Sequence, residues 1–210
     1  MKKKRITAGL LAAVMLLALT ACGGEEAPAG GGEAAAESYK VGICQLVQHP
    51  ALDAATEGFV AAVKDGLGEE NVTIDIQNAS GEVNNCTSIT NKFVSEDVDL
   101  IMANATPALQ AAVNSTLDIP VLGTSVTEYG EALQIENFNG TVGGNVSGTS
   151  DLAPLDQQAA MVKEWFPDAK NVGLLYCSAE ANSIYQVETV KAELEAKGLT
   201  ATLYAFSDTN

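Results

Sequence analysis

The segment YKVGICQLVQHPALDAATEGF, from residue 39 to residue 59, has the hydrophobic pattern of a strand followed by a helix. The apolar run from Val41 to Val47 is nearly continuous, which is typical of a strand buried on both faces of a sheet. Pro50 suits the first turn of a helix, because that position needs no N–H donor. The segment therefore predicts a β–loop–α unit. Since ligands of open α/β sheets bind beyond the carboxyl ends of the strands, we expect its loop to form one wall of a site.

The same alternation continues along the chain to residue 123. Hydrophobic patterns predict strands at 40–47, 72–77, 98–103 and 119–123, with helices at 51–67, 83–95 and 107–115. Asn104 and Thr106 stand just before Pro107, where a helix start needs polar capping residues. Because the strands recur at about the length of one βα repeat, a parallel, doubly wound α/β sheet is the most economical fold.

Residues 124–151 interrupt this pattern with five glycines, little helical periodicity and one short extended run at 141–146. The alternation then resumes, and it predicts helices at 154–166 and 183–196 and strands at 171–177 and 200–206. We therefore expect two Rossmann-like lobes, an N-terminal lobe at 39–147 and a crossover with a partial C-terminal lobe at 148–210. Two parallel strands make a poor independent sheet, so we expect the second lobe to be truncated.

The first 22 residues have the pattern of an export signal. Four basic residues precede an apolar run that is too short for a membrane span, and the segment ends with Leu-Thr-Ala and Cys22. This ending resembles the bacterial lipobox, so we expect Cys22 to carry a lipid; the alternative is an ordinary secretory signal. Residues 23–38 are rich in Gly, Ala and Glu and predict a flexible tether. The expected location is extracytoplasmic, with a lipid anchor in the bacterial cell membrane.

The charge of the chain argues against nucleic acid as a partner. The formal net charge is −16, and without the four bases of the signal, seven basic residues stand against 27 acidic ones, a charge of −20. Nucleic acids and anionic membrane surfaces favour basic patches, which this composition does not provide. The balance fits a soluble extracytoplasmic domain and does not by itself identify a ligand.

The sequence offers no catalytic, cofactor or metal motif. It lacks a P-loop, a dinucleotide-binding fingerprint and a GxSxG elbow, and its only histidine is His49. We therefore expect neither an enzyme nor a resident cofactor or metal. Cys44, Cys86 and Cys177 remain beside Cys22, without metal spacing. Cys44 and Cys86 are candidates for a disulfide, but buried free thiols are the favoured state.

Polar residues follow the predicted strands at their carboxyl ends. Each of them has an alternative role as a cap or turn residue. As a set that converges on one edge from two lobes, they favour a ligand-binding cleft over capping alone. They include Gln45 and His49 after the first strand, Thr106 after the third, Ser125 and Thr127 after the fourth, and Glu180, Asn182 and Ser183 in the second lobe.

Five stretches of the chain resemble, in order, the ABC-type substrate-binding family whose better-known members take up tryptophan and related aromatic amino acids. They are VGICQLVQHPALDAATEGF, NATPALQAAV, VLGTSVTEYGEA, NVSGTSD and VGLLYCSAEANS, and they lie between Tyr39 and Asn210. The resemblance implies a type I periplasmic-binding-protein fold with two hinged lobes. Relatives commonly have Thr-Asp-Pro where this chain has Thr127, Glu128 and Tyr129, which leaves the identity of the ligand open.

The resemblance implies capture of a small molecule between two lobes and delivery to a membrane permease, without chemistry on the ligand. An aromatic amino acid is the expected ligand; a nucleoside, a sugar or a branched-chain amino acid is the alternative, as is a role as an extracytoplasmic ligand sensor. Helix N-termini would hold the carboxylate. The implied contacts are Thr106, Ser125 and Thr127 with the carboxylate, Glu180 or Asp151 with the ammonium, Asn182 and Ser183 beside it, and Gln45, His49 and Leu52 with the side chain.

Overall fold

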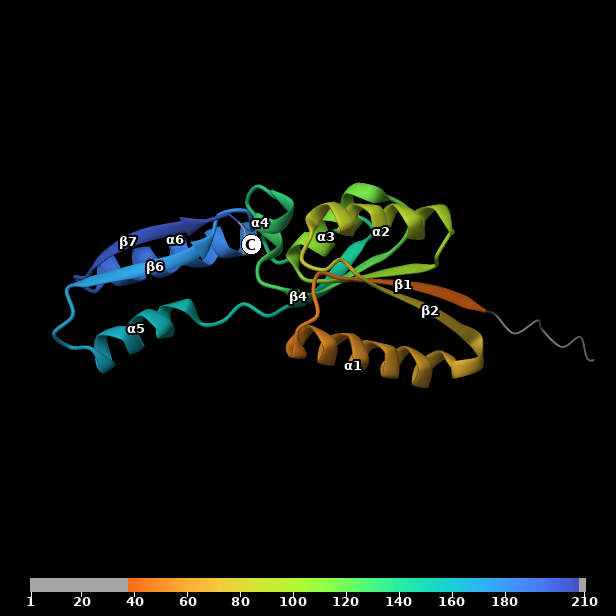
Figure 1. The fold of residues 1–210 in the computed structure, drawn as a ribbon, viewed down its shortest axis with the longest axis horizontal. Coiled ribbons are helices and arrows are strands. Elements are labelled where there is room, and N and C mark those ends of the chain that lie inside the picture. Colours follow the sequence, from red (N-terminus) through yellow and green to blue (C-terminus); the bar gives the residue numbers. More distant parts are fainter. Residues whose placement is uncertain (1–37, 208–210) are drawn as a thin grey trace, which may run out of the picture. The chain divides into compact units, whose positions relative to one another are not determined.

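The computed structural model describes residues 38–207 (Figure 1). The predicted signal at 1–22, the lipidation site Cys22 and residues 23–37 of the predicted tether lie outside the described residues. Within the described part of the chain, no helix is both long and apolar enough to cross a membrane.

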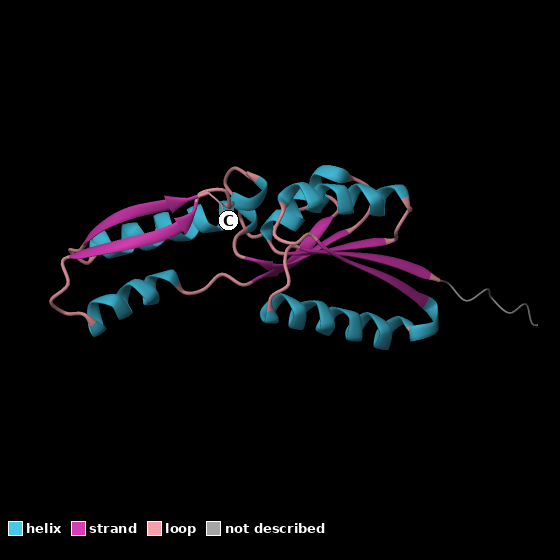
Figure 2. Ribbon diagram, viewed as in Figure 1, coloured by secondary structure: helices cyan, strands magenta, loops and turns pink. Residues whose placement is uncertain are grey.

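Five parallel strands form one sheet, in the order β2-β1-β3-β4-β5. Figure 2 shows the strands in magenta and the helices in cyan. The strands are β1 (Tyr39–Gln45), β2 (Val72–Asn78), β3 (Leu100–Asn104), β4 (Val121–Val126) and β5 (Val146–Ser150). Because all of them are parallel, their carboxyl ends meet at one edge of the sheet. This is the edge to which the sequence assigns its polar residues.

Helices cover both faces of this sheet, as Figure 1 shows. The elements are α1 (Pro50–Leu67), the 3-10 turn η1 (Glu69–Asn71), α2 (Val83–Ser95), α3 (Thr106–Ser115) and α4 (Tyr129–Leu133). On the α1 side, Val41, Ile43 and Met102 form a buried cluster with Phe59 packed against it. On the α2 and α3 side, Phe93 and Leu109 belong to the larger core cluster. The first strand is therefore buried on both faces, as its apolar run predicts.

The second sheet has two parallel strands, β6 (Asn171–Cys177) and β7 (Thr200–Phe206). Two helices belong to the same part of the chain, α5 (Leu155–Trp165) and α6 (Ala181–Ala196). Ala159 of α5, Leu194 of α6 and Ala201 of β7 share one buried cluster. On the strands, Leu175 and Tyr204 are exposed partners in the register of β6 with β7.

Each predicted helix and strand has a counterpart in the structure, and α2, β6 and β7 have the predicted bounds. In contrast, β1 ends at Gln45 instead of residue 47, and β4 spans Val121–Val126 instead of 119–123. The region at 124–151 differs from the prediction. It contains the helix α4, which has five residues and is therefore too short to show a helical periodicity in the sequence. The extended run expected at 141–146 is displaced to β5, which continues to Ser150, past the lobe boundary placed at Ser147.

Cys44 and Cys86 are buried and, like Cys177, are free thiols, which is the favoured expectation. A hydrogen bond with Cys86 and burial raise the pKa of the Cys44 thiol, so this side chain stays neutral.

Candidate functional site

His49 is the last residue of the loop after β1, the loop that the sequence predicts as one wall of the site. It is the N-cap residue of α1, and its Nδ1 accepts a hydrogen bond of 3.2 Å from the backbone N–H of Ala51. Its side chain is exposed, and Leu52, half-buried on the first turn of α1, packs against the core cluster. A cap of this kind fixes the direction in which the helix leaves the loop.

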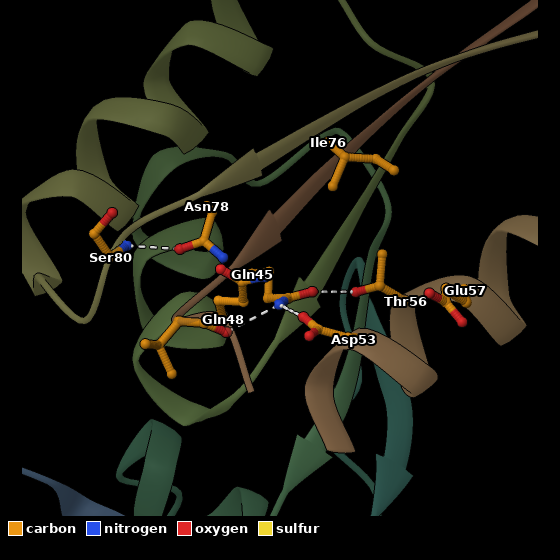
Figure 3. A pocket seen from close by; sticks show the side chains of 9 residues that line it. Gln45, Gln48, Asp53, Thr56, Glu57, Ile76, Asn78 and Ser80 are labelled. Carbon is orange, nitrogen blue, oxygen red and sulfur yellow. Dashed lines mark hydrogen bonds between the residues drawn. The ribbon is translucent and has the colours of Figure 1, made fainter. Parts of the chain in front are cut away.

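Gln45, the last residue of β1, is buried and uses its whole side-chain amide within this wall (Figure 3). Its Nε2 donates to Asp53 Oδ1 at 2.6 Å and to the carbonyl of Val47 at 2.9 Å. Its Oε1 accepts from Thr56 Oγ1 at 2.7 Å. The amide therefore joins the end of the strand to the first turns of α1.

Asn104, the last residue of β3, extends this network to the next strand. Its Nδ2 donates to the carbonyl of Leu52 at 2.8 Å and to Thr56 Oγ1 at 2.9 Å. Asn104 is fully buried, and its Oδ1 has no hydrogen-bond partner among the described residues. The network thus links the ends of β1 and β3 to the first turns of α1.

A hollow of about 810 Å³ lies beside this network, on the side of β1 and β2 that α1 covers (Figure 3). The carboxylates of Asp53 and Glu57 give it acidic character, and Ile76 of β2 provides an apolar surface. The hollow is also lined by Gln45, Val47, Gln48, Thr56, Asn78 and Ser80. Five of the lining residues (Gln45, Val47, Gln48, Asn78 and Ser80) lie at or just beyond the carboxyl ends of β1 and β2.

The connection from β3 to α3 has an unusual backbone. Ala105 has φ 96°, a conformation that residues other than glycine adopt at a cost of about 1–3 kcal/mol. Its N–H donates to the carbonyl of Thr124 at 3.0 Å, which ties the turn to β4. Thr106 then begins α3 with a buried side chain, and its hydroxyl makes no hydrogen bond within residues 38–207. The helix thus starts with an unpaired hydroxyl beside its free N–H groups.

The end of β4 is irregular in the same region. Its pairing with β5 shifts register between Gly123 and Val126, and Ser125 has φ 54°. Thr127 follows with a buried side chain. The hydroxyls of Ser125 and Thr127 have no hydrogen-bond partner in the part of the chain that the structure describes. Two hydroxyls at the end of β4 thus join the unpaired hydroxyl at the end of β3.

Glu128 and Tyr129 both make structural contacts. The Glu128 carboxylate accepts from the N–H groups of Gly130 and Glu131, at 3.0 and 2.6 Å, and so caps α4. The Tyr129 hydroxyl donates to the carbonyl of Thr149 at 3.1 Å. Burial, together with the negative charge of Asp151, raises the pKa of Tyr129 to about 12.

This pKa predicts an alkaline loss of stability. Below pH 10 the phenol is neutral in both states, whereas between about pH 10 and 12 the unfolded chain loses its proton and the folded chain keeps it. Ionisation therefore stabilises the unfolded state as the pH rises. From pH 8 to pH 11, the stability of the native sequence relative to Tyr129→Phe should fall by about 1.4 kcal/mol, measured by urea unfolding. A difference that stays constant with pH would contradict the buried phenol.

The second-lobe residues gather at the start of α6. Glu180 is the N-cap residue, and its Oε2 accepts from Asn182 Nδ2 at 3.3 Å. The Oδ1 of Asn182 is buried without a partner among the described residues, and Ser183 is half-buried. Asp151 lies elsewhere, exposed just after β5, where its N–H donates to the carbonyl of Val126 at 3.1 Å.

Comparison with known proteins identifies the family to which this architecture belongs. The family model for ABC transporter substrate binding proteins matches residues 40–210. This chain belongs to that family. It is 40% identical to the tyrosine-binding protein of Clostridioides difficile (strain R20291), over 90% of this chain and 56% of that protein.

Two solved structures are similar to this substrate-binding protein. One is the ABC domain from Streptococcus pneumonia in complex with L-Trp, with 34% identity and a TM-score of 0.75. The other is the ligand-free, open structure of a substrate binding protein with adhesive properties from Clostridium difficile, with 41% identity and a TM-score of 0.61. Each comparison covers 81% of this chain and 58% of the other. The chain thus spans a little over half the length of the relatives it matches, and the predicted type I periplasmic-binding-protein fold is confirmed.

In this substrate-binding protein, the predicted site residues fall into two groups. The carboxyl edge of the five-stranded sheet carries Gln45, His49, Leu52, Thr106, Ser125, Thr127 and, beyond β5, Asp151. The start of α6 carries Glu180, Asn182 and Ser183. Sequence reasoning missed Asp53 and Thr56, which hold Gln45. The sequence feature that could have indicated them is a pair of polar residues one turn apart at the start of α1, the helix that follows β1.

Proposed function

We propose that this substrate-binding protein captures an aromatic amino acid, tyrosine or tryptophan, and delivers it to an ABC permease. The observation that carries the proposal is the set of unpaired hydroxyls of Thr106, Ser125 and Thr127. Thr106 follows β3, Ser125 lies near the end of the neighbouring strand β4, and Thr127 directly follows β4. The names of the relatives, a tyrosine-binding protein and a domain in complex with L-Trp, support this ligand class.

The ligand carboxylate would lie at the start of α3. The first N–H groups of a helix carry partial positive charge and lack partners within the helix. Thr106 adds a hydroxyl donor at that position, and Ser125 and Thr127 add two more from the next strand. Because these hydroxyls make no hydrogen bond within the described residues, an incoming carboxylate would replace no internal partner.

Other residues would receive the rest of the ligand. In the first lobe, Leu52 and His49 would line the side chain, while Gln45 would hold the wall through Asp53 and Thr56. Glu180 or Asp151 would pair with the ammonium group, and Asn182 and Ser183 would contribute from the second lobe. Binding drives closure of the lobes only if the ligand has higher affinity for the closed state, and that closed form would then dock on the permease. Cys22 would anchor the protein by its lipid.

A ligand panel tests the proposal on the full chain. Thermal shift and calorimetry would compare L-tyrosine and L-tryptophan with tyramine, which lacks the carboxylate, and with 3-(4-hydroxyphenyl)propionate, which lacks the ammonium. Leucine, a sugar and a nucleoside complete the panel. We expect a rise in melting temperature with the aromatic amino acids and little with either truncated ligand; at a hundredfold excess over Kd the stabilisation is about 2.7 kcal/mol. A shift only with leucine, the sugar or the nucleoside would overturn the ligand class.

A further inference from the structure

The phenol of Tyr129 packs against the paired strands β4 and β5 at a point where each strand has a glycine. It begins α4, and its side chain is buried. Gly123 of β4 and Gly148 of β5 are register partners. A Cβ at Gly123 would lie 2.5 Å from the Tyr129 hydroxyl, and one at Gly148 would collide with that hydroxyl and with the carbonyl of Gly123. The phenol therefore occupies a place that both strands provide.

The backbone of β4 becomes irregular directly beyond this point. The register with β5 shifts after Gly123, and Ser125 takes its φ of 54° within the shifted stretch. The segment is fastened again beyond it, where Ser150 Oγ donates to the carbonyl of Thr127 at 2.7 Å. The hydrogen bond from Tyr129 to Thr149 falls between these two points, on the same strand β5. Ser125 thus lies between two points at which the chain is attached to β5, and Thr127 lies at the second of them.

We propose that Tyr129 is a positioning residue for ligand binding. Its hydroxyl holds β5 against the irregular end of β4, and this sets the backbone from which Ser125 and Thr127 present their hydroxyls. Tyr129 itself would not touch the ligand. The proposal rests on the proposed function, because it assigns these two hydroxyls to the ligand.

The variant Tyr129→Phe tests this role, because it keeps the ring and removes only the hydroxyl. Two quantities would be measured on the full chain: amide hydrogen exchange across residues 121–130 without ligand, and the Kd for L-tyrosine. We expect faster exchange at 124–127 and a Kd raised about five- to tenfold, the equivalent of one hydrogen bond.

Two controls separate positioning from general loss of stability. Tyr204→Phe removes the hydroxyl of an exposed tyrosine on β7, and we expect no change in exchange or affinity. Thr90→Val removes buried hydrogen bonds of α2, including that of Thr90 with Ser115 at 2.8 Å, without touching β4. We expect this variant to melt earlier and to bind L-tyrosine as the native sequence does.

The outcomes distinguish this proposal from the proposed function. Unchanged affinity in Tyr129→Phe, with native binding present, would overturn the positioning role even if stability fell. An equal loss of affinity in Thr90→Val would overturn it too. If the native chain bound no aromatic amino acid, the proposed function would fail, and hydrogen exchange would decide: faster exchange confined to 124–127 would support the anchor, and unchanged exchange would overturn it.

Discussion

Replacing Phe93 with alanine is expected to lower the free energy of unfolding by about 3–5 kcal/mol. Phe93 lies on α2 and is fully buried in the core cluster. Its ring faces Gly42 of β1, where an added Cβ would stand 2.6 Å from the ring. Because Gly42 has no side chain, β1 offers no atoms at this position that could fill the space left by the ring. Alanine would leave a cavity in addition to losing the transfer free energy of the aromatic group.

Urea unfolding of Phe93→Ala beside Phe166→Ala would measure this effect. Phe166 follows α5 and is 60% exposed, so its removal should change stability by no more than about 0.5 kcal/mol. The two variants delete the same atoms from different surroundings. Equal losses in both would show that the packing of α2 on β1 is not as close as the Gly42 contact indicates.

The regular elements could be predicted because local hydrophobic pattern determines them. The apolar residues of β1 alternate between the α1 side, with Val41 and Ile43, and the α2 side, with Cys44. The helix α2 and the strands β6 and β7 have the predicted bounds, since polar or turn residues border each apolar run. Where buried residues recur with the period of a helix or a strand, a single sequence is enough to predict that element.

The region between β4 and the crossover could not be predicted, because its order comes from contacts distant in sequence. The strand β5 reads VSGTS, has no apolar alternation, and is mostly exposed. It exists by pairing with β4 and by accepting the hydrogen bond of Tyr129. The helix α4 depends on the carboxylate cap of Glu128. Neither contact has a periodic signature in the sequence.

The candidate site divides in the same way. The position of a polar residue after a parallel strand could be predicted, and so Thr106, Ser125 and Thr127 share one edge with Gln45. Which of these side chains has free hydrogen-bonding groups could not be predicted. For Gln45, this depends on how α1 packs against the strand end, because Asp53 and Thr56 of α1 bind its amide. The Gln45 amide has three internal hydrogen bonds, whereas the threonine hydroxyls have none within the described residues.

This difference leads to the second large effect, for the double variant Thr106→Val and Thr127→Val. Hydrogen bonds to a charged group contribute about 1.5–3 kcal/mol each, so loss of two to a ligand carboxylate should raise the Kd for L-tyrosine about 100-fold or more. Valine has nearly the shape of threonine, and both sites are buried. Because neither hydroxyl has an internal partner in residues 38–207, the double variant should unfold at the same urea concentration as the native protein or a higher one.

Thr90→Val provides the matched opposite case. Its buried hydroxyl donates to the carbonyl of Cys86 at 3.0 Å and lies within hydrogen-bond distance of the Ser115 hydroxyl, at 2.8 Å. The same chemical change should therefore lower stability and leave affinity unchanged. Calorimetric titration and urea unfolding of both variants therefore separate hydroxyls that serve the ligand from hydroxyls that serve the fold. If the double variant bound L-tyrosine like the native protein, the carboxylate would not lie at the start of α3. If it instead lost stability, the two hydroxyls would belong to the fold, as Thr90 does.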